Sequence, residues 1–229
     1  RYPFGIEKHI DRLKQSCRKQ LFENVDFSLI ENNISKIASQ YENGYVRILI
    51  LRNDSDEDFT IYSFYQLPIK ISENYKLESQ PAPWHPGGDF DVNSDNIVGS
   101  KSTSYAYNIK QTRDAIRNGF SDALLLSSKG VVLEGPTFSV GWIKDEVVYV
   151  PDLDLGILDS ITRKYLLEFG SANKINTAVS RVTIDELYTV DTVFAMSTAK
   201  HGIFVSTIDD TEYTPVSYTH LRAHETERN

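Results

Sequence analysis

The chain has 229 residues, of which 40% are hydrophobic, 24% charged and 11% aromatic, a composition ordinary for a globular protein of one large or two small domains. Its formal net charge of −8 argues against a nucleic-acid-binding protein, and its apolar stretches are far shorter than the ~18 residues that span a bilayer. The single cysteine, Cys17, excludes an internal disulfide or a cysteine metal cluster and favours a cytoplasmic protein.

The first 71 residues predict a small α+β unit. Apolar side chains recur at spacings of three and four from Ile6 to Leu21, which indicates an amphipathic helix. A second helix is expected over residues 28–43, ended by Gly44. Residues 45–53 and 59–71 are rich in β-branched and aromatic residues, and the charged stretch between them predicts a hairpin turn.

A linker follows this unit. Residues 78–91 hold three prolines and two glycines, so we place a small domain at 1–84, a linker at 85–95 and a larger domain at 96–216. The same stretch could also act as a substrate-gating loop. Residues 217–229 break in character, and we expect a cloning or fusion tail there.

The second half alternates helices and short strands. A helix is expected over residues 104–119 and another over 159–170, begun by Ser160 and stopped by Gly170. Short strands are expected within 122–128, 131–135, 138–145 and 146–151. Residues 180–198 predict a strand, a short acidic helix and a further strand.

Four features of the larger domain draw attention, although each alone suits an ordinary surface position. Lys101 follows a Gly-Ser pair, and Glu134 lies between an apolar run and a Gly-Pro turn. The stretch LDSITR opens a helix, and STAKHG has the composition of a turn. Taken singly, they suit a solvated lysine, a turn acid, a helix entry and a loop.

Together, their order and spacing resemble the class IV (fold type IV) pyridoxal-phosphate aminotransferases. The matching stretches are KSTSY, VVLEGP, LDSITR, VFAMSTA and, near the start, EKHIDRL. The resemblance covers roughly residues 1–210, and its family includes branched-chain and D-amino acid aminotransferases and aminodeoxychorismate lyases. It implies an α+β fold of two domains, a small α+β domain and a larger β-barrel-like domain with flanking helices, assembled as a homodimer. Family members usually carry further N- and C-terminal segments, so we expect a fragment.

The resemblance implies pyridoxal 5′-phosphate as the cofactor and gives three residues roles at its ring. Lys101 would form the Schiff base and shuttle the substrate's α-proton. Glu134 would hold the proton on the pyridine nitrogen by ion pairing. Tyr105 would donate a hydrogen bond to the phenolic oxygen, with Tyr107 as the nearby competitor.

The same resemblance assigns a phosphate site. Ile161 and Thr162 would supply amides at a helix N-terminus, and Thr198 a hydroxyl from a second loop. Arg12, on the first helix, would pair with the phosphate.

The helix entry departs from the family at two residues. Asp159 and Ser160 stand where the family usually has Pro-Gly or a similar pair. A carboxylate beside a phosphate is unfavourable, so we expect Asp159 to point outward. We interpret Arg163, which follows Thr162, as a structural residue of the helix.

Substrate contacts are expected from Tyr45 and Arg47, which resemble a Tyr-x-Arg strand of the branched-chain enzymes, and from Ala199. Alternation puts Tyr45 and Arg47 on one side of their strand, although an edge-strand aromatic and a surface arginine explain the pattern equally well.

The favoured function is transamination of an α-amino acid, branched-chain or otherwise hydrophobic, to a 2-oxo acid by a ping-pong mechanism. The alternatives are aminodeoxychorismate lysis, D-amino acid transamination, a non-catalytic family member, and a small-molecule-binding module without covalent chemistry. We assign no metal, nucleic-acid or membrane partner.

Overall fold

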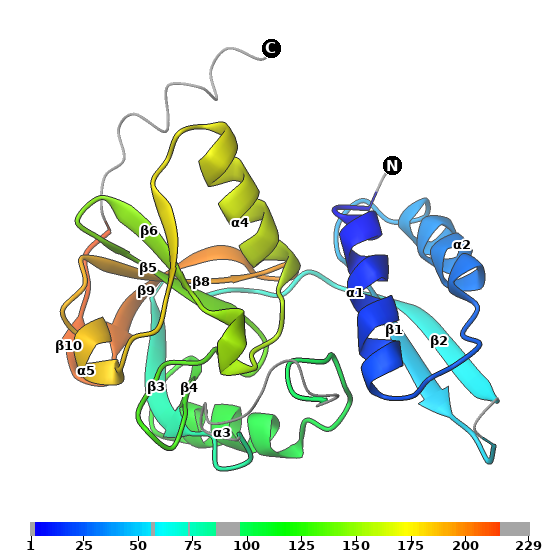
Figure 1. Cartoon of the computed structure of the whole chain (residues 1–229), viewed down its shortest axis with the longest axis horizontal. Coiled ribbons are helices and arrows are strands. Elements are labelled where there is room, and N and C mark those ends of the chain that lie inside the picture. The colour runs from blue at the N-terminus through cyan, green and yellow to red at the C-terminus, as the bar shows by residue number, and fades with distance from the viewer. Residues whose placement is uncertain (1–2, 56–57, 73, 86–96, 216–229) are drawn as a thin grey trace.

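The computed structural model describes residues 3–55, 58–72, 74–85 and 97–215, which form two lobes (Figure 1). The smaller lobe holds α1 (Ile6–Lys19), α2 (Phe27–Ala38) and a hairpin of β1 (Tyr45–Arg52) and β2 (Phe59–Gln66). The rest of the described chain forms the larger lobe.

The smaller lobe is a two-layer α+β unit. Its strands pair antiparallel, with Tyr45 opposite Gln66 and Arg52 opposite Phe59, as the hairpin pattern predicts. The two helices bury an apolar stripe against one face of the hairpin. That core consists of Ile10, Ile30 and Ile34, with Val46, Ile48, Ile50 and Ile61 of the strands packed against it.

Eight strands form one mixed sheet in the larger lobe, in the order β4-β3-β9-β8-β5-β6-β7, with β10 beside β9. β3 runs parallel to β4 and β9, and β6 parallel to β7, while the other pairs are antiparallel. The strands are β3 (Tyr75–Pro81), β4 (Asp122–Leu126), β5 (Ser139–Lys144), β6 (Val147–Pro151), β7 (Thr177–Ser180), β8 (Thr192–Ser197), β9 (His201–Ile208) and β10 (Thr211–Glu212); the helices are α3 (Ala106–Arg117), α4 (Ile161–Ala172), α5 (Ile184–Leu187) and the 3₁₀ turn η1 (Leu153–Leu155).

The two outer regions of this sheet are joined by residues 131–134, which we call the closing segment. Its Leu133 amide donates to Leu125 of β4 at 3.0 Å, and the Leu125 amide donates to the Glu134 carbonyl at 2.9 Å. On its other side, Val132 donates to the carbonyl of Val182, just beyond β7, at 2.9 Å. The sheet therefore curls into the barrel-like form that we expected.

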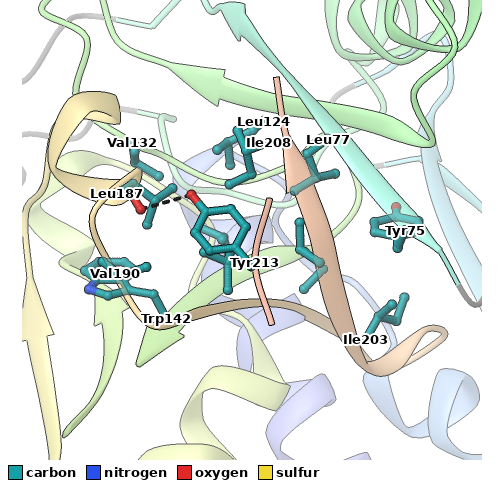
Figure 2. Packing of buried hydrophobic residues seen from close by; sticks show 14 of the residues in the cluster. Tyr75, Leu77, Leu124, Val132, Trp142, Leu187, Val190, Ile203, Ile208 and Tyr213 are labelled. Carbon is teal, nitrogen blue, oxygen red and sulfur yellow. Dashed lines mark hydrogen bonds between the residues drawn. The ribbon is translucent and has the colours of Figure 1, made fainter. Parts of the chain in front are cut away.

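The interior of the curled sheet is the main hydrophobic core (Figure 2). Alternate residues of its strands point inward, as the period of two along a strand requires. Tyr213 belongs to this core, and its hydroxyl donates to the Leu187 carbonyl at 3.0 Å (Figure 2). The fully buried members include Leu77, Leu124, Val140, Val193, Val205 and Ile208.

The structure differs from the sequence predictions at several elements, including the following. β3 belongs to the larger sheet, so the boundary expected after residue 84 is wrong: the larger lobe already begins at Tyr75. Residues 131–135 make isolated bridges and not a strand of their own. α2 ends at Ala38, well before Gly44, and α4 continues past Gly170 to Ala172.

Two expected segments fall outside the described residues. Of the linker at 85–95, only residue 85 is described, and the tail at 217–229 lies wholly outside. Within the described part of the chain, every helix is too short or too polar to span a bilayer.

Candidate active site

Lys101 lies between the lobes and is held through its backbone by α1. Its amide donates to the Ser16 hydroxyl at 2.9 Å, and its carbonyl accepts from the Gln20 side chain at 3.0 Å. The Lys101 side chain itself is exposed, and its Nζ donates to the Tyr105 hydroxyl at 3.1 Å. Anchored main chain and accessible amine suit a reactive lysine.

This geometry distinguishes Tyr105 from its competitor Tyr107. Tyr107 stacks on Trp84 with ring centroids 5.2 Å apart and is 59% exposed. Of the two hydroxyls, it is that of Tyr105 which bonds the Lys101 amine. The structure thus favours Tyr105 as the tyrosine of the site.

A glycine brings the lysine loop against the loop that carries Leu158. Gly99 has φ +76°, and a Cβ built on it would lie 2.8 Å from the Ile157 carbonyl oxygen. Only glycine fits such a left-handed close approach without strain. The contact therefore lies two residues before Lys101 in one loop and one residue before Leu158 in the other.

Glu134 ends the closing segment, and its carboxylate contacts the loop that carries Leu158. Its Oε1 accepts the Leu158 amide at 3.2 Å. Burial raises the pKa of Glu134 to about 7, while the Leu158 hydrogen bond and the positive charges of Lys101 and Arg12 oppose that shift. A carboxyl group so balanced at neutral pH would be ionised fully by one further cation nearby.

Arg12 carries positive charge from the smaller lobe to this space. Its Nη1 donates to the Asp159 carbonyl at 3.4 Å, immediately before α4. Burial lowers the pKa of Arg12, and the neighbouring Asp159, Tyr105 and Glu134 oppose that shift. The guanidinium nevertheless stays charged, because arginine is not deprotonated in proteins.

The N-terminus of α4 supplies a second electropositive element. Ser160 is its N-cap residue, and the Ser160 and Thr162 hydroxyls lie 2.8 Å apart. Ile161 is buried, at 1% exposed, so it fixes the first turn in the larger lobe. The unpaired amides of a first helical turn favour an anion, and Arg12 points at the same turn.

Asp159 was expected to point outward, but its carboxylate lies beside two cations of α4. Its Oδ2 lies 2.8 Å from Lys164 Nζ and its Oδ1 3.9 Å from Arg163 Nη1, so two cations of α4 offset its charge. Arg163 is 5% exposed and donates from Nε to the Pro151 carbonyl at 3.2 Å, as expected of a structural residue.

Thr198 and Ala199 form the tip of the β8–β9 hairpin and are both half-buried. The Thr198 hydroxyl lies 3.3 Å from His9 Nε2 on α1. Burial, followed by the charges of Arg12 and Lys101, lowers the pKa of His9 to about 4. His9 is therefore neutral at physiological pH and can form a hydrogen bond with Thr198 without adding charge.

Tyr45 and Arg47 are not brought to this group by any contact among the described residues. Val46 and Ile48 of β1 face the helices, so alternation turns Tyr45 and Arg47 to the opposite face of the hairpin. Tyr45 is half-buried there and Arg47 is exposed.

His9 is the residue of this site that the sequence did not single out. It stands one helical turn before Arg12, on the same face of α1. The His-x-x-Arg spacing was the available signal, but a lone histidine on an amphipathic helix gives no indication of a partner 189 residues away.

The fold combines a curled mixed sheet with a smaller α+β lobe. The candidate site adds a lysine, a buried glutamate and a helix N-terminus. Together these features define a class of enzyme. Residues 1–208 match the family model of amino-transferase class IV, and the chain belongs to that family.

Curated relatives of the chain carry the names of more than one enzyme. Aminodeoxychorismate lyase of Bacillus subtilis is 25% identical over 220 residues, covering 92% of this chain and 75% of the relative. A probable branched-chain-amino-acid aminotransferase of Rickettsia bellii is 32% identical over 220 residues, covering 90% and 73%.

Solved structures share the fold. A fold IV transaminase from Curtobacterium pusillum matches with a TM-score of 0.83 at 24% identity, covering 99% of this chain and 82% of that one. A hypothetical aminotransferase from Mycobacterium tuberculosis, in a form with α-ketoglutarate and PMP bound, matches with a TM-score of 0.85 at 22% identity, covering 95% and 80%. The fold class is therefore that of the fold type IV enzymes.

Proposed function

We propose that the protein is a pyridoxal-phosphate-dependent aminotransferase that moves the amino group of an α-amino acid to a 2-oxo acid. A branched-chain or other hydrophobic amino acid is the favoured donor. The observation that carries the proposal is that the positive charges of Lys101 and Arg12 both act on the buried Glu134 carboxyl group, while Arg12 also bonds the Asp159 carbonyl just before α4. The Mycobacterium tuberculosis neighbour, which also has a PLP-bound form, supports the choice of cofactor.

The residues present fit this cofactor. Glu134, with a pKa of about 7, needs one more cation to become fully ionised, and a protonated pyridine ring is such a cation. Arg12 and the α4 amides suit a phosphate dianion, to which Thr162 and Thr198 would add hydroxyl donors. Lys101 supplies the amine that the aldehyde group requires.

Each of these residues would then have a defined task. Pyridoxal phosphate, when bound, supplies an electron sink for the substrate's α-carbon. The Lys101 amine would hold the cofactor and, once free, would take up and return the α-proton of the donor. Glu134 keeps the proton on the pyridine nitrogen, and the Tyr105 hydroxyl holds the Lys101 amine in place.

Both half-reactions use the same amine. In the second half, Lys101 moves a proton in the reverse direction, so that the 2-oxo acid acceptor leaves as an amino acid. Ala199, at the hairpin tip, would contribute an amide to the substrate carboxylate. Tyr45 and Arg47 stay substrate-site candidates by resemblance alone, as does the homodimer; the cytoplasmic location rests on the single cysteine.

Aminodeoxychorismate lysis is the second candidate, favoured by the name of the Bacillus subtilis relative. The same lysine would then promote elimination of pyruvate and formation of 4-aminobenzoate. D-amino acid transamination is the third: a D-alanine aminotransferase of Bacillus licheniformis is 34% identical over 109 residues, 48% of this chain.

The deciding experiment combines trapping with a substrate panel. Protein loaded with pyridoxal phosphate is reduced with borohydride, and the modified peptide is identified by mass spectrometry; Lys101 is the expected site. Unreduced protein is then given L-leucine with 2-oxoglutarate, D-alanine with 2-oxoglutarate, or aminodeoxychorismate, and the products are measured.

Two variants control this experiment. Lys101→Ala should abolish both the label and the turnover, whereas Lys110→Ala, on the exposed face of α3, should keep both. Label and turnover that persist in Lys101→Ala would overturn the proposal.

A further inference from the structure

A buried lysine lies two residues beyond Thr198, at the tip of the β8–β9 hairpin. Lys200 is only 9% exposed, and its side chain enters the larger lobe. Its Nζ donates to the Tyr75 hydroxyl at 2.9 Å and lies 3.0 Å from Asp122 Oδ2. The cation thus ties the hairpin tip to the first residues of β3 and β4.

Asp122 is 4% exposed and fully engaged by donors. Besides Lys200, its carboxylate accepts from the Tyr75 hydroxyl at 3.2 Å, the Thr112 hydroxyl at 2.7 Å and the Ala123 amide at 2.9 Å. A buried pair completed in this way holds a defined geometry, and the loss of one partner leaves an uncompensated charge.

The same ammonium also reaches the turn that carries Glu134. Lys200 Nζ lies 4.7 Å from the centre of the Phe138 ring, a cation–π contact. That ring fills the space over Gly135, where an added Cβ would come within 2.1 Å of it. Gly135 is the neighbour of Glu134. The Lys200 side chain, which belongs to the hairpin tip, therefore also contacts a residue that packs against the turn of Glu134.

We infer that Lys200 is a positioning residue of the active site. Its buried pair with Asp122 sets the hairpin tip, with Thr198 and Ala199, in place relative to the turn of Glu134. What the tip does for the cofactor rests on the proposed function, but its placement does not. Among the described residues, the tip is also held by the pairing of Ser197 with His201, by the Lys200 amide on the Ser197 hydroxyl at 3.0 Å, and by Thr198 at 3.3 Å from His9.

The first test is hydrogen exchange in the protein without cofactor. Lys200→Met keeps the aliphatic stem and removes the cation, so amides of residues 197–201 and 134–138 should exchange about tenfold faster or more. Lys144→Met, at the far end of β5, is the matched control and should leave both segments unchanged. Unchanged exchange at the tip in Lys200→Met, even with a lower melting temperature, would overturn the inference.

A double variant separates position from stability. Lys200→Met with Asp122→Asn removes both charges, so it should recover melting temperature relative to Lys200→Met alone. Its tip should nevertheless still exchange fast, and its Kd for pyridoxal phosphate should be about tenfold higher than that of the wild type. Return of wild-type exchange and affinity in the double variant would show that the pair serves stability alone, which overturns the inference. If the wild type binds no pyridoxal phosphate, the proposed function fails, and the exchange rates still decide the role of Lys200.

Discussion

At the scale of single residues, Glu134 shows how one side chain can be prepared for a partner. Burial disfavours its charge, whereas the Leu158 amide, Lys101 and Arg12 favour it, and the resulting pKa is about 7. Such a group is poised between its two forms. The cation that binds beside it decides which form prevails.

Replacing Glu134 by Gln tests this role. The amide keeps the shape and an acceptor for Leu158 but cannot hold a positive ring by charge, so kcat should fall by about 100-fold or more. The fold and the attachment of the cofactor to Lys101 should persist. Steady-state kinetics and the visible absorbance of the bound cofactor check both points.

Glu168→Gln is the matched control, because Glu168 is an exposed acid on α4 paired with Lys8. It should retain full activity. An unfolded Glu134→Gln protein would return Glu134 to a structural role at the end of the closing segment.

His9 makes the unliganded protein sensitive to acid. Its pKa is about 4 in the folded protein and 6.5 when unperturbed, so the unfolded chain takes up a proton first as the pH falls. This contribution to stability is present above pH 6.5 and is lost as the pH falls from 6.5 through 4. It amounts to at most about 3 kcal/mol.

His9→Gln should therefore lose less stability than the wild type between pH 6.5 and 4. Glu134 acts in the opposite direction, since its raised pKa removes stability as the pH rises from 4.5 through 7. The effect of His9 is accordingly the difference between the two proteins in thermal melts over this range. Parallel curves would contradict it.

At the scale of elements, the loops around Lys101 depend on one close approach. Gly99 allows residues 98–100 to lie against the Ile157 carbonyl, and a side chain there would force the loops apart. Gly119 also has a positive φ of +90°, yet a Cβ on it would meet nothing within 4 Å. A comparison of substitutions at the two glycines therefore separates the effect of the left-handed backbone from the effect of a crowded side chain.

Gly99→Ala and Gly119→Ala should both lose about 1 kcal/mol or more of stability from the left-handed backbone. In Gly99→Ala alone, affinity for pyridoxal phosphate should also fall by about tenfold, because Lys101 moves away from Glu134. Denaturant unfolding and cofactor titration measure the two effects. Equal affinity in the two variants would remove Gly99 from the site.

Elements with strong local patterns were predictable. The helix stripe from Ile6, the hairpin at 45–66 and the helices at α3 and α4 all appear near their expected places. β3 was missed because its proline-rich end resembles a linker, and its partners β4 and β9 are remote in sequence. Residues 131–135 have a strand's composition, but their hydrogen bonds go to two separate regions, which no local pattern reveals.

The site was predictable only as far as its motifs reach. Lys101, Glu134, Arg12 and the start of α4 could be singled out because each belongs to a recognisable stretch, and in the structure Lys101 and Arg12 both act on the charge of Glu134. Their roles stay predictions. The buried Lys200 could not be anticipated, since its partner Asp122 lies 78 residues earlier in the chain. A tertiary pair of that kind leaves no spacing to detect.

At the scale of the whole molecule, the site draws on both lobes. Arg12 and His9 come from the smaller lobe, while Glu134, α4 and the hairpin tip come from the larger one. A ligand that binds this site therefore links the two lobes thermodynamically.

Saturating pyridoxal phosphate should accordingly raise the stability of both lobes together, by about 2.7 kcal/mol at a hundred times its Kd. At the same cofactor concentration, Arg12→Met should reduce that gain, because it removes the charge that the smaller lobe contributes and so raises the Kd. Calorimetry with and without cofactor checks this, with Arg113→Met of α3 as the control. A full gain in Arg12→Met would mean that the larger lobe binds the cofactor alone.

The closing segment has a consequence for the order of folding. It connects β4 with the chain beyond β7, regions more than fifty residues apart, and contacts of that range form late. Because Glu134 ends this segment, its carboxyl group reaches its place only when the sheet has curled. We therefore expect a newly made chain to capture its cofactor as a last step, so that cofactor uptake reports a completely folded molecule.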